Sequence, residues 1–212
     1  MGSVVIIGGV LALIGGVAWL GWMQEKKRKE AIQAAALALG FSYSEEGSSE
    51  GLGLPLFERG HGRRVRNALT GQTAGNPVTV MDYQYTIGSG KNSQTHRQTV
   101  AIFPEAGRGL PAFELGPENF LHRIGQVFGY QDIDFDEDPE FSKSFLLRGE
   151  DENAIRKVFG ASVRAACGNF TEWSVQCREG RVAVFRQGWR PDPAELPSFL
   201  ANALRIVTAI KN

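Results

Sequence analysis

The longest apolar stretch of the chain lies close to its N-terminus. Residues 4–23 are twenty consecutive positions without a charged side chain. A helix of that length rises about 30 Å, which matches the hydrocarbon core of a bilayer. Trp19 and Trp22 stand near the C-terminal end of the stretch, and indole rings favour the headgroup layer. The pattern predicts a transmembrane anchor over residues 1–23.

A basic segment follows the apolar stretch directly. It consists of Lys26, Lys27, Arg28 and Lys29, and no Lys or Arg precedes residue 4. A cleaved signal peptide shows the opposite order of charge, and the positive-inside rule places the basic side in the cytoplasm. We therefore expect a single-pass protein of the cytoplasmic (inner) membrane, with its N-terminus outside and residues 24–212 inside. Trp19, Trp22 and the four basic residues are expected at the membrane surface.

Residues 24–40 predict a basic juxtamembrane helix. The segment is rich in strong helix formers, and Gly40 suits the left-handed position that ends a helix. Ile32, Ala35, Ala36 and Leu39 share one face of this helix. We expect the helix to continue the membrane span and to dock through that face on a domain formed by residues 41–212.

The first half of that domain predicts strands, and helices enter in the second half. Alternating apolar and polar positions and turn residues predict strands over 41–43, 54–58, 64–70, 78–87, 95–103, 110–115, 145–148, 171–177 and 181–187. Residues 44–53 are a loop by composition, and 88–93 are expected to form a hairpin loop. Helical spacing predicts helices over 117–129 and 150–159, and a final helix after the capping residue Asp192. The order favours an α+β fold, a mostly antiparallel sheet with helices packed on one face.

Charge and cysteine content exclude several classes of protein. The chain has 23 basic and 23 acidic residues, whereas nucleic-acid binders show a basic excess. Two cysteines exclude a disulfide scaffold and a four-cysteine zinc module. The stretch Gly88-Ser89-Gly90-Lys91 lacks the flanking glycine and the Ser or Thr of a phosphate-binding loop, and a solvated hairpin loop is the better interpretation. We expect neither a cofactor nor a metal.

The densest acidic run contains the alternating residues Asp132, Asp134 and Asp136. A calcium loop would need a glycine at Glu137 and a glutamate at Lys143, so the spacing does not match. In a strand the three Asp would share an exposed face, while Ile133 and Phe135 pack inward. A solvated face is the simplest interpretation, and a contact with a protein partner or a cation is the alternative.

The remaining candidate groups are isolated. His61, His96 and His122 lack the spacing of metal ligands, and Cys167 and Cys177 are expected to be buried thiols. Arg63, Arg64 and Arg66 predict a basic strand edge, where an anion or a lipid headgroup could dock or where the charges are ordinary surface. No nucleophile and base stand at a recognisable spacing, so we do not expect an enzyme.

One segment resembles a known group of proteins. The run Asp138-Pro139-Glu140-Phe141-Ser142-Lys143-Ser144-Phe145 is similar to an Asp-Pro-Glu-Phe-x-Lys-x-Phe segment of uncharacterised bacterial membrane-anchored proteins. The resemblance implies a soluble α+β domain after an apolar anchor. It departs from that group in having one span, and since the function of the group is unknown it lends no catalytic residue.

The sequence thus favours a membrane-anchored protein with a cytoplasmic partner-binding or scaffold domain. The alternative is a domain that senses a small molecule or a lipid at the membrane surface. The pattern names no protein partner and no oligomeric state.

Overall fold

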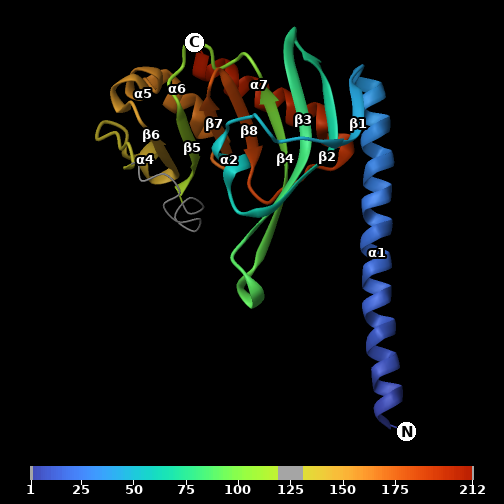
Figure 1. Ribbon diagram of the computed structural model, residues 1–212. Helices are drawn as coiled ribbons and strands as arrows, with labels where there is room; N and C mark the ends of the chain where they lie inside the picture. The colour runs from blue at the N-terminus through green and yellow to red at the C-terminus, as the bar shows by residue number, and fades with distance from the viewer. Residues whose placement is uncertain (1, 119–130, 212) are drawn as a thin grey trace.

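The chain begins with one long helix, α1 (Gly2–Leu39), which runs from the predicted anchor into the folded domain (Figure 1). The computed structural model describes residues 2–118 and 131–211, and for residues 2–14 and 18 it describes the backbone alone. Helix α1 ends at Gly40, whose φ of 70° allows the amide of Phe41 to donate to the carbonyl of Ala36 at 2.8 Å. This is the helix end that the sequence predicted.

The domain is built on an eight-stranded sheet in the order β1-β2-β3-β4-β8-β7-β5-β6. Every neighbouring pair is antiparallel. The strands are β1 (Ser42–Gly47), β2 (His61–Thr73), β3 (Asn76–Ile87), β4 (Gln94–Phe103), β5 (Phe113–Pro117), β6 (Phe145–Gly149), β7 (Trp173–Arg178) and β8 (Arg181–Arg186). The α+β class with an antiparallel sheet is therefore confirmed.

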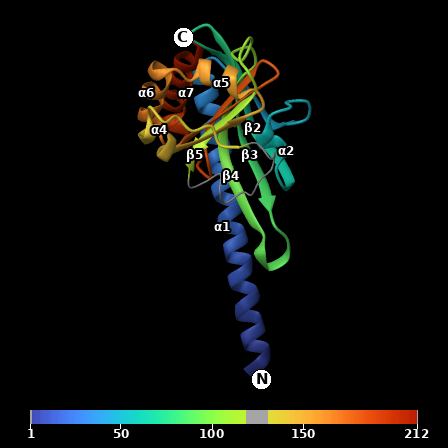
Figure 2. The ribbon, with the colours of Figure 1, turned by 90° about the vertical axis from the view of Figure 1, so that its left-hand side faces the viewer.

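Helices cover the two faces of the sheet unequally. The larger core lies between one face and the helices α4 (Pro139–Ser144), α5 (Glu152–Val158), α6 (Ala161–Cys167), α7 (Leu196–Lys211) and the C-terminal part of α1 (Figures 1 and 2). The smaller core lies on the other face, under the short helix α2 (Pro55–Glu58). Single turns of 3₁₀ helix occur at Gly90–Asn92, Gly168–Phe170 and Pro193–Glu195.

Several local predictions were wrong or fall outside the described residues. Of the predicted strand 54–58, residues 55–58 form α2 instead, and Pro55 occupies the first turn of this helix. Part of the predicted loop 44–53 forms β1, an edge strand that is held by backbone pairing to β2. Helices α4 and α6 were not predicted. The predicted helix over 117–129, with His122, lies for the most part outside the described residues, although Pro117 itself ends β5.

Helix α1 docks on the domain through the predicted face. Ile32 and Ala36 are buried in the larger core, and Ala35 and Leu39 pack against it at its rim. This docking is confirmed. The domain boundaries at 23 and 40 stay predictions: the helix passes position 23 without a break and ends at Leu39.

Two ion pairs join the basic segment of α1 to the domain. Arg28 donates to both carboxylate oxygens of Asp82 on β3, from Nε at 2.8 Å and from Nη2 at 2.9 Å. Asp82 also accepts from Thr99 Oγ1 at 2.7 Å and from Asn67 Nδ2 at 3.1 Å, so the buried carboxylate is fully bonded. One helical turn earlier, Glu25 pairs with Arg190 at 2.9 Å.

Among the residues whose side chains the structure describes, no helix is long and apolar enough to cross a membrane. The predicted span over residues 4–23 lies in large part outside those described side chains.

Replacing Arg28 with Gln should lower the free energy of unfolding by about 3 kcal/mol, because it leaves the Asp82 carboxylate buried without its guanidinium partner. Denaturant unfolding of the full chain in neutral detergent measures the change. The matched control is Lys27→Gln, an exposed neighbour that should change stability by less than about 0.5 kcal/mol. Equal losses in the two variants would show that the pair does not hold the helix.

Candidate functional site

A groove lies between α1 and one end of strands β2, β3 and β4. Its volume is about 200 Å³. The lining residues come from five separate parts of the chain, and they are Glu25, Arg64, Arg66, Asn67, Asp82, Tyr83, Gln84, Arg97 and Arg190. We call this feature the arginine groove.

The alternation of side chains along the strands places the arginines there. On the face of β3 that α1 covers, Val78 and Val80 belong to the core, and Asp82 and Gln84 follow them toward the end of the strand. Across the sheet, Gln84 pairs with Arg64 of β2 and with Arg97 of β4. Each strand thus contributes an apolar half beneath the helices and a polar half to the floor of the groove.

Positive charge is in excess in the arginine groove. Asp82 and Glu25 are already paired with Arg28 and Arg190. The hydrogen bond from Arg190 holds the pKa of Glu25 below its usual range, so this carboxylate is ionised at neutral pH. Among the residues that the structure describes, no carboxylate lies within 4 Å of the arginines 64, 66 and 97. Arg97 donates only to the neutral Gln84, at 2.7 Å.

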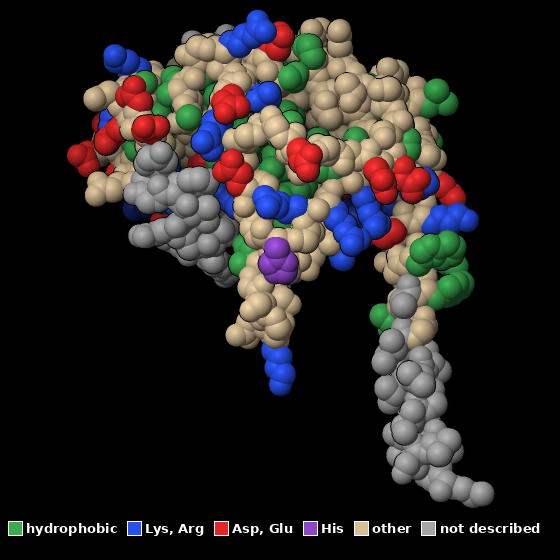
Figure 3. All heavy atoms as spheres, in the orientation of Figure 1, with side chains coloured by type: hydrophobic (Ala, Val, Ile, Leu, Met, Phe, Trp, Pro, Cys, Tyr) green, Lys and Arg blue, Asp and Glu red, His purple; other side chains and the backbone are tan. Residues whose placement is uncertain are grey.

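The groove continues toward the predicted membrane surface. A neighbouring hollow is lined by Trp22, Lys26, Lys29, Glu45 and Glu46 together with Glu25, Arg66 and Asn67, and the last three residues also line the arginine groove. Lys26 lies over the ring of Trp22, with its Nζ 5.6 Å from the ring centroid. In Figure 3, Lys and Arg side chains gather on this face between the β3–β4 hairpin and α1.

The predicted membrane-surface residues divide between two roles. Trp19 and Trp22 are exposed on α1, as are Lys26 and Lys27, and Lys29 lies partly exposed beside Glu45. Arg28 instead points inward to Asp82. Successive residues of a helix are rotated by about 100°, so a run of four basic residues cannot share one face. The run therefore supplies both surface charge and one structural ion pair.

The β3–β4 hairpin extends beyond the rest of the sheet, in the direction in which the N-terminal half of α1 leaves the domain (Figures 1 and 2). Ile87 is five residues beyond Asp82, or about 16 Å along the strand. A similar distance along α1 from Arg28 reaches about as far as Trp19. Residues 84–97 include Lys91 and Arg97 and no acidic residue. Ile87 therefore lies about level with Trp19, and the polar, basic loop that follows it reaches past both tryptophans.

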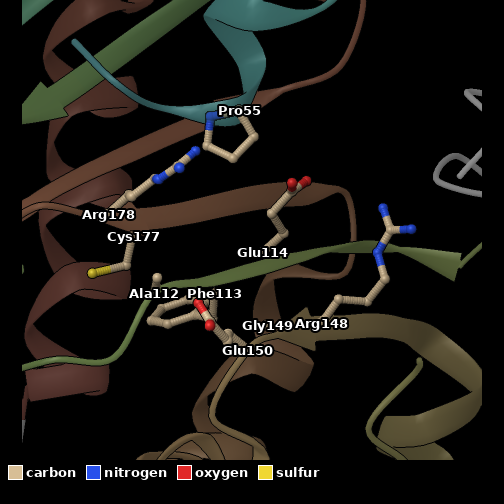
Figure 4. A pocket seen from close by; sticks show the side chains of 9 residues that line it. All are labelled: Pro55, Ala112, Phe113, Glu114, Arg148, Gly149, Glu150, Cys177 and Arg178. Atoms are coloured by element: carbon tan, nitrogen blue, oxygen red, sulfur yellow. The ribbon is translucent and has the colours of Figure 1, made fainter. Parts of the chain in front are cut away.

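A smaller pocket lies near the other edge of the sheet (Figure 4). Its volume is about 80 Å³, and Glu114 and Arg178 point from the strands toward Pro55. Glu114 is buried and already bonded to Arg59 and to Gln176 Nε2. Cys177 also lines the pocket, but burial raises the pKa of its thiol to about 12. At neutral pH the pocket therefore offers a buried ion pair, in which Arg59 Nε has no hydrogen-bond partner among the described residues, and a protonated thiol.

The acidic run has the predicted exposure without the predicted strand. Asp132, Asp134 and Asp136 are exposed, although the carboxyl of Asp132 turns back to accept from the Leu147 amide at 3.1 Å, and Ile133 and Phe135 are buried in the larger core. The segment is extended chain, held where the amide of Ile133 donates to the carbonyl of Leu147 at 2.8 Å. It lies beside β6, at the opposite edge of the sheet from α1. Its role as a partner face stays a prediction.

The other candidate groups lie apart from one another. His61 Nε2 is 2.9 Å from the carbonyl oxygen of Gly88, and the ring of His96 stacks on Tyr85. Cys167 and Cys177 are free and buried, as predicted. Arg63 donates to the carbonyl of Phe57 on the opposite face from the arginine groove. Within residues 2–118 and 131–211, no three His, Cys, Asp or Glu residues are placed to hold a metal ion.

The sequence identified part of the arginine groove. Arg64 and Arg66 were recognised as a basic patch, but β2 is an interior strand between β1 and β3 rather than a sheet edge. Arg97, Arg190 and Glu25 were not connected with them, since they are far apart along the chain. Only the strand register joins Arg97 to Arg64.

Comparison with known proteins shows the fold alone. No family model matches the chain, and no curated protein matches it. Among solved structures, the crystal structure of the mycobacterial trehalose monomycolate transport factor A, TtfA, is similar, with a TM-score of 0.64. The similarity covers 87% of this chain and 94% of that chain at 10% sequence identity.

Stability should depend on pH through Asp132. Burial raises the pKa of this carboxyl to about 6, against the hydrogen bond from the Leu147 amide, and the charges of Asp134 and Glu118 add to the rise. The folded state then holds the proton more tightly than the unfolded state, so ionisation of Asp132 destabilises the fold as pH rises from about 4 to about 6. Asp132→Asn removes this loss and keeps an acceptor for Leu147.

The melting temperature of Asp132→Asn should therefore equal that of the parent chain near pH 4 and exceed it at pH 7. Thermal unfolding over this pH range measures the difference. Asp136→Asn, at an exposed position of the same run, removes the same charge and is the control for a general effect of charge on stability. A difference for Asp132→Asn that is constant with pH would contradict the raised pKa.

Proposed function

We propose that the chain is a single-pass protein of the cytoplasmic membrane, whose domain lies against the cytoplasmic surface as an accessory factor in lipid transport. The observation that supports this best is the continuity of α1 with the domain. The helix is unbroken from the predicted anchor to Leu39 and is tied to the sheet by Arg28–Asp82 and Glu25–Arg190. A helix held in this way fixes the distance and orientation of the domain relative to the bilayer.

The surface that would face the membrane has the composition such a position requires. Trp22, Lys26 and the basic β3–β4 hairpin all lie on the side of the domain from which the N-terminal half of α1 departs. Indole rings favour the headgroup layer, and basic residues are attracted to anionic lipid by about 1 kcal/mol each near the surface.

An accessory role rather than catalysis fits the chemistry of the arginine groove. Its free groups are guanidinium groups, which stay protonated at every physiological pH and so bind anions without transferring protons. The solved structure of similar fold is that of a transport factor, which is the basis for assigning this chain to lipid transport. The exposed Asp132, Asp134 and Asp136 lie at the sheet edge away from α1, where a protein partner would have access.

A second function is favoured by the arginine groove itself. A groove of about 200 Å³ beside the membrane would also serve a domain that senses a lipid or a small molecule. A sensor must change conformation when the ligand binds. Hydrogen exchange of the full chain with and without lipid separates the two: protection confined to the groove supports the accessory role, and altered exchange at α5 and α6 supports sensing.

Orientation should depend on the exposed lysines. In a bacterial host the full chain should remain in the membrane after carbonate extraction, and a reporter fused after Asn212 should be active only in the cytoplasm. Replacing Lys26, Lys27 and Lys29 together with Gln should give a mixed orientation, because it removes the positive charge that follows the anchor. Arg28 is kept, since it holds the fold.

The control for this experiment is a triple variant at exposed positions of the domain, Arg108→Gln, Lys143→Gln and Lys157→Gln. It has the same change of net charge and should keep the parent orientation. Release of the parent chain by carbonate, or an externally active reporter, would contradict the anchoring. Unchanged export of pulse-labelled lipid after depletion of the protein from its host would contradict the transport role.

A further inference from the structure

We propose that the arginine groove binds the phosphate-bearing headgroup of an anionic lipid from the leaflet beside α1. The inference rests on the proposed anchoring, and it names the ligand chemistry of the surface that faces the membrane. It follows from the charge of the groove, its shape and its position along α1.

The arginines 64, 66 and 97 are arranged to share one anion. Arg64 and Arg97 lie on the strands that flank Gln84, about 10 Å apart at the backbone, and Arg66 is two residues along β2 from Arg64. Long side chains cover that distance. Guanidinium groups present paired N–H donors that match phosphate oxygens, so three of them can bind one phosphate with several charge-assisted hydrogen bonds.

The carboxylates of the groove do not oppose an anion. Asp82 is neutralised by Arg28 and Glu25 by Arg190, and both pairs join α1 to the domain beside the groove. The lining therefore keeps the net charge of its three unpaired arginines. The same ion pairs hold the helical wall at a fixed distance from the strands, so the groove is formed before a ligand arrives.

The position of the groove favours a lipid over a free anion. The groove is continuous with the hollow of Trp22 and Lys26, and it opens toward the part of α1 that leaves the domain. Val17, Trp19 and Leu20 on that part of α1 are large apolar side chains that are more than half exposed. A headgroup in the groove would place its acyl chains along this apolar surface.

The experiment is native mass spectrometry of the full chain in neutral detergent, with equimolar phosphatidylglycerol and phosphatidylcholine. The parent chain should retain phosphatidylglycerol in preference to phosphatidylcholine. The combined variant Arg64→Gln, Arg66→Gln and Arg97→Gln should retain about tenfold less phosphatidylglycerol. The triple Arg108→Gln, Lys143→Gln and Lys157→Gln, with the same loss of charge on other surfaces, should retain as much as the parent.

Equal losses in the two triple variants, or equal retention of the two lipids by the parent, would overturn the proposal. If inorganic phosphate at the concentration of the lipid displaces phosphatidylglycerol completely, the groove is a site for free anions and the lipid assignment is wrong. All three arginines are exposed, so the groove variant should melt at the parent temperature. If it unfolds, Arg64→Gln and Arg97→Gln are tested singly. The proposal is overturned if neither single variant lowers the retention of phosphatidylglycerol.

Carbonate extraction separates this inference from the proposed function. The groove variant should stay in the membrane, because its anchor is unchanged. A parent chain that is released by carbonate yet binds phosphatidylglycerol through the groove would overturn the anchoring alone. A chain that stays embedded but retains no anionic lipid would overturn the groove assignment alone.

Discussion

The buried carboxylate of Asp82 is the constraint on which the arrangement of the molecule depends. A charge in a protein interior is tolerated only when it is paired and hydrogen-bonded. Asn67 and Thr99 supply two hydrogen bonds from the neighbouring strands, and the compensating charge comes from Arg28 on α1. The Asp82 carboxylate is therefore neutralised only when α1 is docked with Arg28 facing β3. The depth of the hairpin and the wall of the arginine groove follow from that docking.

The sheet then separates two surfaces of opposite charge. The arginine groove lies over β2, β3 and β4 beside α1, whereas the run of Asp132, Asp134 and Asp136 lies beside β6 at the far edge. A domain held against a membrane by its basic end would expose its acidic end to the cytoplasm. This separation allows contact with lipid at one edge and with a protein at the other, without competition between them.

Local patterns predicted the elements whose residues are close in sequence. The alternation over β3, β4, β7 and β8, the capping residue Asp192 and the docking face of Ile32 and Ala36 were all correct. The patterns could not separate Arg28 from its basic neighbours, since its inward partners, Asp82, Thr99 and the carbonyl of Pro191, are all distant along the chain. The arginine groove was seen only at Arg64 and Arg66, because Arg97 joins it through the pairing of β3 with β4 and Arg190 through its ion pair with Glu25, and no local pattern encodes either contact.

The central claim is that α1 holds the hairpin end of the domain at the headgroup layer, and spin-label depth measurement tests it most directly. Lys91→Cys labels the hairpin, and Asn76→Cys labels the opposite end of β3. The native Cys167 and Cys177 are buried with pKa values of about 12, so they should not react. In lipid nanodiscs, oxygen from the bilayer should relax the label at residue 91 more strongly than the label at 76. Equal relaxation at both sites, or stronger relaxation at 76, would contradict the account.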